Sequence, residues 1–135
     1  MLEKMIDLRT VFVAVSMLLL VPGCQRETRP TSTGGVEQIA RGKRLYEQHC
    51  AACHEADTGI GPRLSKKVIA THARAISLFD YTRRFMPYGA GNSLEERVYW
   101  DITGYVLSRH GFLPPGMVLG AHNAKRIILV PGLLH

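Results

Sequence analysis

The stretch Cys50-Ala51-Ala52-Cys53-His54, CAACH in one-letter code, places a histidine directly behind two cysteines that are three residues apart. Three kinds of site use such a pattern: a redox-active dithiol, one half of a zinc site, and an attachment point for haem. A thioredoxin-like dithiol needs a strand–helix setting, and no βαβ pattern surrounds these cysteines. A structural zinc site needs four ligands, usually with a second Cys/His pair at a defined spacing. The chain has one further cysteine, Cys24, far from this stretch.

Haem attachment requires only the residues that are present. Cys50 and Cys53 lie about one helical turn apart, so each thiol can add to a vinyl group of the porphyrin. The imidazole of His54 then projects toward the iron from the same side. We therefore expect one covalently bound c-type haem, attached at Cys50 and Cys53, with His54 as the proximal iron ligand.

The flanking sequence resembles a known family. Residues 42–54, GKRLYEQHCAACH, are similar to the N-terminal helix and attachment site of class I cytochromes c, and residues 61–64, GPRL, resemble the loop that follows it. In that family the proline carbonyl accepts a hydrogen bond from the proximal imidazole. The resemblance implies this role for Pro62, which would fix the tautomer of His54 so that its other nitrogen binds iron.

The second axial ligand is implied by the same resemblance. Arg84-Phe85-Met86-Pro87 resembles the Met-Pro element of class I cytochromes c, which makes Met86 the expected distal ligand. A thioether is a soft ligand that favours ferrous iron and raises the reduction potential. His72, as part of a bis-histidine pair, is the alternative, and we expect Met117 to be a packing residue.

The N-terminal sequence predicts export. Residues 11–21, VFVAVSMLLLV, form an uncharged apolar run behind Lys4 and Arg9. This run is shorter than the roughly 20 residues of a membrane-spanning helix and has the length of a secretory signal. Val21-Pro22-Gly23-Cys24 resembles the lipobox of bacterial lipoproteins, which implies a lipid anchor on Cys24 at the periplasmic side of a bacterial membrane. The alternative is an ordinary signal peptide and a soluble periplasmic protein.

The 135 residues suffice for one small domain. We expect a signal peptide over 1–23, a flexible tether over 24–35, a cytochrome c domain over 36–120 and an irregular tail over 121–135. Helical spacing starts at Val36, Ser77 is a candidate N-cap for a middle helix, and Ser93 with Glu96 forms a capping box for the last one. The predicted fold is mainly α: a class I cytochrome c fold with three to four helices around the haem, in which Gly42 allows close approach of Tyr105.

The charge balance limits the partners. Lysine and arginine number 17 against 11 acidic residues, giving a net charge of +6. Such a balance favours an acidic protein partner or an anionic membrane surface. Basic and aromatic residues are not interleaved as in nucleic-acid-binding proteins, so we expect no nucleic-acid partner. The candidates for steering a partner are Lys43, Arg44, Lys66 and Lys67.

A longer stretch carries a more specific resemblance. Residues 79–119 read FDYTRRFMPYGAGNSLEERVYWDITGYVLSRHGFLPPGMVL. They resemble the haem subunits of bacterial molybdenum sulfite dehydrogenases, with a D-Y-x-R-R-x-M-P element, a G-x-S-L turn and a proline-rich P-x-x-x-V-L tail. Cytochromes that serve quinoprotein dehydrogenases share much of this pattern. The resemblance implies positions near the haem for four residues: Tyr81, Arg83, Arg84 and Trp100.

These features predict an electron carrier rather than an enzyme, with no catalytic residues. Iron with both axial positions filled does not bind substrate and cycles between ferric and ferrous states. The expected partners are redox proteins, such as a dehydrogenase, a terminal oxidase or another cytochrome, with an acidic docking face. The alternative is a haem protein with an open iron site, acting as a gas binder, a sensor or a redox enzyme, in which Met86 does not bind iron.

Overall fold

The computed structural model describes residues 33–130. The predicted signal peptide, Cys24 and most of the predicted tether lie outside the described residues. The described part is helical, without strands, and has one isolated bridge between Arg74 and Ile128. Its helices are α2 (Thr33–His49), α3 (Ala51–His54), α4 (Lys66–Ala70), α5 (Ala75–Phe85) and α6 (Glu96–Arg109). The prediction of a mainly α fold is confirmed, with α3 and α4 as short additions to three longer helices.

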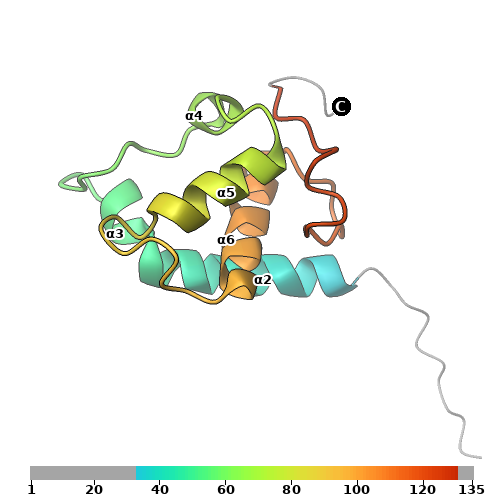
Figure 1. Cartoon of the computed structure of the whole chain (residues 1–135), viewed down its shortest axis with the longest axis horizontal. Coiled ribbons are helices and arrows are strands. Elements are labelled where there is room, and N and C mark those ends of the chain that lie inside the picture. Colours follow the sequence, from blue (N-terminus) through green and yellow to red (C-terminus); the bar gives the residue numbers. More distant parts are fainter. Residues whose placement is uncertain (1–32, 131–135) are drawn as a thin grey trace, which may run out of the picture.

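Helices α2 and α6 cross in direct backbone contact, and α5 packs on α6 (Figure 1). A Cβ atom on Gly42 would overlap the carbonyl oxygen of Asp101 and lie 2.8 Å from the Cβ of Tyr105. The close approach expected at Gly42 is therefore present. Beside it, Arg41 Nε donates to Asp101 Oδ2 at 2.9 Å, and the side chain of Asp101 is only 4% exposed. A paired buried carboxylate fixes the relative position of the two helices.

The C-terminal segment closes the far side of this helix pair. The buried amide of Gln38 donates from Nε2 to the Leu119 carbonyl at 2.9 Å, and the Leu119 N–H donates back to Gln38 Oε1 at 2.7 Å. Its carbonyl and amino groups are thus both paired, as burial requires. Ala124 and Leu129 lie in the predicted irregular tail, 121–135, and are fully buried in the core.

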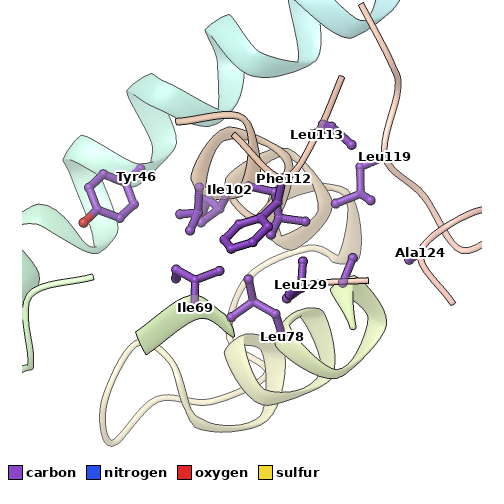
Figure 2. Close-up of a cluster of buried hydrophobic side chains, with 12 residues drawn as sticks. Tyr46, Ile69, Leu78, Ile102, Phe112, Leu113, Leu119, Ala124 and Leu129 are labelled. Carbon is purple, nitrogen blue, oxygen red and sulfur yellow. The ribbon is translucent and has the colours of Figure 1, made fainter. Parts of the chain in front are cut away.

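One hydrophobic cluster joins these elements (Figure 2). Its side chains come from α2, α4, α5, α6 and the C-terminal segment. The members labelled in the figure are Tyr46, Ile69, Leu78, Ile102, Phe112, Leu113, Leu119, Ala124 and Leu129. Non-local contacts therefore supply most of the core, and α6 packs against both α2 and α5.

The helix starts differ from those expected. Helix α2 begins at Thr33, three residues before Val36. Helix α5 begins at Ala75 rather than after Ser77. The Ala75 N–H donates to the Ile127 carbonyl at 3.0 Å, and the preceding residue, Arg74, has an extended backbone. The predicted capping box was wrong: α6 begins after Glu95 without a side-chain cap. Ser93 instead lies in the loop between α5 and α6.

None of the described helices combines the length and the apolar character that crossing a bilayer requires.

The α2–α6 contact can be tested with Gly42→Ala. We expect the haem-loaded variant to lose about 2–3 kcal/mol of unfolding free energy, because the added Cβ forces two backbones apart and outweighs the gain in helix propensity. Denaturant unfolding followed by circular dichroism measures the loss. The matched control is Gly34→Ala on the same helix, whose Cβ would meet only the movable Val118 side chain at 3.2 Å. Equal stability of the two variants would contradict the close contact.

Candidate functional site

Two cavities meet at the residues that the sequence predicts to bind haem. The inner cavity, of about 310 Å³, lies among α2, α4, α5 and α6, and the outer cavity, of about 530 Å³, opens beside Ile60 and Tyr88. Both volumes fall in the range of cofactor pockets. Four residues line both cavities: Cys50, His54, Pro62 and Met86. Cys53 lines the outer cavity, so the structure brings together the residues predicted to attach the haem, to bind its iron and to orient the imidazole.

Helix α3 presents the cysteines and the histidine on one turn. It continues from α2 through the Cys50 N–H, which donates to the Tyr46 carbonyl at 2.8 Å, and the His54 N–H donates to the Cys50 carbonyl at 3.0 Å. Cys50 and Cys53 are half-buried free thiols. Burial, and then the nearby Cys53, raises the pKa of Cys50 to about 11, so this thiol is protonated at neutral pH.

The described residues do not support a zinc site. Within 33–130 no group of three or more His, Cys, Asp or Glu side chains is arranged to hold a metal ion.

A loop after α3 fixes the imidazole of His54. The ring is 9% exposed, and its Nδ1 lies 2.7 Å from the Pro62 carbonyl oxygen. A carbonyl only accepts, so Nδ1 carries the proton and Nε2 is left as the nitrogen that can bind iron. Gly61 makes this possible, because a Cβ there would lie 2.8 Å from His54 Cε1. Sequence reasoning missed Gly61, whose only signal is its place next to Pro62.

A partly exposed ion-pair network anchors α3 from behind. Glu55 accepts from the Tyr46 hydroxyl at 2.8 Å and from Arg109 Nη1 at 2.7 Å. The hydrogen bond from Arg109, followed by that from Tyr46, holds the pKa of Glu55 below its usual value. Tyr46 belongs to α2 and Arg109 ends α6, so Glu55 ties the attachment turn to both long helices. Nothing in the local sequence reveals this network.

On the opposite side, Met86 lies at the end of α5. Its N–H donates to the Thr82 carbonyl at 2.9 Å, and its carbonyl accepts from the Tyr99 hydroxyl at 3.0 Å. The alternative ligand, His72, lines the inner cavity only and packs against Tyr81, with 5.0 Å between ring centroids. Met117 lines neither cavity. Of these three candidates, Met86 alone reaches both cavities.

The residues expected near the haem separate into two groups. Tyr81 lines the inner cavity, and Arg84 lies with it along a third hollow beside Met86. Arg83 instead donates from Nε to Asn92 Oδ1 at 3.2 Å, on the loop side of α5. Trp100 stacks on Phe79, with ring centroids 3.5 Å apart, and lines neither cavity.

The four candidate steering cations also lie away from the cavities. Lys43 pairs with Glu47 at 3.9 Å, and the Lys66 ammonium lies 5.3 Å from the centroid of the Phe112 ring. Arg44 and Lys67 are exposed, and none of the four lines either cavity. Ile60 and Tyr88, which are 77% and 80% exposed, form an apolar rim at the outer cavity instead.

The donor set and the walls fit a covalently held haem. Two thiols and a buried imidazole face the cavities, and the inner wall is apolar: Leu64, Ile69, Leu78, Ile102 and Val106. The buried Thr103 hydroxyl, also on this wall, has no hydrogen-bond partner among the described residues. A flat apolar group with polar substituents matches such a lining.

Residues 37–106 match the family described as cytochrome c oxidase, cbb3-type, subunit III. The chain belongs to this family of cytochromes c. Membership implies a covalently bound haem and a role in electron transfer. The class I cytochrome resemblance is thereby supported over the larger part of the predicted domain.

The cytochrome is also similar to longer proteins. It is 26% identical over 120 residues to the thiosulfate dehydrogenase of Stutzerimonas stutzeri (strain A1501), covering 79% of this chain and 38% of that protein. It is 33% identical over 81 residues to the thiosulfate dehydrogenase of Allochromatium vinosum, covering 50% of this chain and 30% of that protein. Photosystem II extrinsic protein V of Cyanidioschyzon merolae is 34% identical over 67 residues, covering 44% of this chain and 45% of that protein. The cytochrome thus spans less than half the length of each of these relatives. No solved structure matches it.

The role of Gly61 can be tested with Gly61→Ala. We expect the haem-loaded variant to lose about 1–3 kcal/mol of unfolding free energy, because the added Cβ pushes the His54 ring away from the Pro62 carbonyl. Denaturant unfolding followed by both circular dichroism and haem absorption measures this loss. The neighbouring Thr58→Ala in the same loop is the control and should unfold like the unmodified cytochrome. Unchanged stability of Gly61→Ala would contradict the tight packing of the loop on His54.

Proposed function

We propose that this cytochrome is a mono-haem electron carrier outside the cytoplasm, acting as acceptor or subunit of a periplasmic dehydrogenase similar to sulfite dehydrogenases. The observation that carries the proposal is that His54 and Met86 line both cavities while the two cysteines stand on the same turn as His54. This arrangement suits covalent attachment and two axial protein ligands.

The protein residues define what the site can do. A bound haem supplies a one-electron couple between ferric and ferrous iron. With His54 and Met86 as axial ligands, no coordination position is left for a substrate. The Pro62 carbonyl keeps the imidazole in one tautomer. The apolar inner wall excludes water, and a thioether ligand together with a low dielectric raises the reduction potential.

On the surface, the residues that would contact a redox partner differ from the charges that would attract it. Ile60 and Tyr88 at the outer cavity offer an apolar contact where an electron can enter or leave. The net charge of +6 favours approach of an acidic docking face, in an encounter that added salt weakens. The exposed Arg44 and Lys67 add to this attraction from outside the contact itself.

The class of upstream partner rests on resemblance. The sequence of residues 79–119 resembles haem subunits of sulfite dehydrogenases, and two relatives are thiosulfate dehydrogenases. Sulfite and thiosulfate are both oxyanions of sulfur, which supports a dehydrogenase of that substrate class as the electron donor. We further propose that Cys24 carries a lipid that holds the carrier at the periplasmic face of a bacterial membrane.

Met86→Ala tests the electron-carrier proposal. The unmodified cytochrome should stain for haem after denaturing electrophoresis, and its ferric spectrum should show a thioether-to-iron charge-transfer band. We expect Met86→Ala to lose this band completely, because the sulfur is removed. Met117→Ala, which removes the exposed sulfur that lines neither cavity, should keep it. His72→Ala should keep it as well.

A haem protein with an open iron site would give a different spectrum from the proposed electron carrier. A five-coordinate high-spin ferrous spectrum of the unmodified cytochrome would indicate an open iron site and exclude the proposed carrier. Persistence of the band in Met86→Ala would show that another residue is the ligand.

The lipid anchor has its own test. We expect Cys24→Ser to move the cytochrome from the membrane fraction to the soluble periplasmic fraction, because the thiol that accepts the lipid is removed. Fractionation of cells that express either form, followed by haem staining, measures the distribution. A neighbouring change, Gln25→Ser, should leave the cytochrome with the membrane. Retention of Cys24→Ser in the membrane fraction would rule out this anchor.

A further inference from the structure

The distal ligand is carried by a segment without regular structure. Residues 86–95 connect α5 to α6 and contain neither helix nor strand. From Tyr88 to Ser93 the side chains are exposed. Helical hydrogen bonds therefore do not hold the position of Met86 from its C-terminal side, and other contacts must do so.

The hydroxyl of Tyr99 makes contacts at both ends of this segment. It donates to the Met86 carbonyl at 3.0 Å and accepts from the Leu94 N–H at 3.4 Å. One side chain of α6 therefore bridges Met86 at the start of the segment and Leu94 near its end. A second tie, from the Asn92 N–H to the Arg83 carbonyl at 2.7 Å, joins the loop to α5 and lies at the surface.

The ring that carries this hydroxyl is itself buried. Tyr99 is 1% exposed and belongs to α6, two residues before Asp101, which contacts Gly42 and Arg41. Its hydroxyl thus connects the distal segment to the helix that crosses α2. Helix α5, by contrast, holds Met86 through the hydrogen bond from the Met86 N–H to the Thr82 carbonyl at 2.9 Å.

We infer that Tyr99 is a positioning residue that keeps the Met86 thioether against ferric iron, which rests on the proposed role of Met86 as distal ligand. A soft thioether binds ferric iron less strongly than ferrous iron. In the ferric state the bond therefore depends more on how firmly the protein holds the sulfur in place. Loss of the Tyr99 hydroxyl raises the fraction of molecules in which the segment has moved away.

The test measures competition for the distal position in the haem-loaded cytochrome. Imidazole added to the ferric protein replaces Met86 and removes the thioether-to-iron band. The apparent affinity for imidazole rises in proportion to the fraction of molecules in which Met86 has moved away from the iron. We expect Tyr99→Phe to bind imidazole roughly 3- to 10-fold more tightly, which is the effect of one lost buried hydrogen bond on that fraction. The phenylalanine ring keeps the packing of Tyr99.

Tyr105→Phe is the matched control. It makes the same chemical change on the same helix, and Tyr105 contacts the Tyr46 ring, at 5.4 Å between centroids, rather than the distal segment. Its imidazole affinity should equal that of the unmodified cytochrome. If Tyr99→Phe and Tyr105→Phe bind imidazole equally, the positioning role is excluded. If the unmodified cytochrome lacks the band, the proposed Met86 ligand fails instead, which separates the two outcomes.

A measurement on the unmodified cytochrome covers the case in which Tyr99→Phe does not fold. The Leu94 amide lies outside α6, yet its hydrogen bond to the buried Tyr99 hydroxyl should protect it from hydrogen exchange. We expect its exchange to be at least 10-fold slower than that of the neighbouring exposed Ser93 amide. Equal exchange of these two amides would overturn the inference.

Discussion

The site depends on the backbone contact between α2 and α6 at Gly42. Because this residue has no side chain, the Asp101 carbonyl lies directly against it, and the ion pair between Arg41 and the buried Asp101 carboxylate fixes the crossing. Helix α2 runs on into the turn that carries the cysteines and His54, and α6 carries Tyr99 and Arg109. The two sides of the haem site are therefore attached to a single rigid crossing, which sets their separation before any cofactor contact is considered.

Neither proposed iron ligand stands on a long helix, and each is held by contacts that reach back to one. His54 is oriented by the Pro62 carbonyl, and Glu55 behind it is bound by Arg109 at the end of α6. Met86 is held at its carbonyl by Tyr99, from the start of the same helix. Helix α6 thus supports both ligand segments from opposite ends. A shift of this helix would change the proximal and the distal sides together, which couples the geometry of the site to the stability of the core.

Local spacing in the sequence was enough to predict the attachment turn, the mainly α fold and the glycine at the helix crossing. The resemblance to class I cytochromes c pointed to Pro62 and Met86, which the structure brings to the same two cavities as His54. Local spacing did not reveal Gly61, the Glu55–Arg109 pair or Tyr99, because their partners are defined only by the folded chain. Arg109 lies 54 residues from Glu55. The helix start at Ala75 was misjudged for the same reason, since the Ala75 N–H donates to the carbonyl of the distant Ile127.

The distribution of charge follows from how the cavities are built. Apolar and aromatic side chains make up most of both cavity linings, and the long cationic side chains of the described residues lie outside these linings. Two of them are already engaged, Lys43 with Glu47 and Lys66 with the Phe112 ring. In the proposed carrier, the net charge then acts at long range on the rate of encounter, while Ile60 and Tyr88 determine the short-range contact. Association rate and contact affinity are consequently set by different residues, which allows a carrier to meet its partner quickly and still release it.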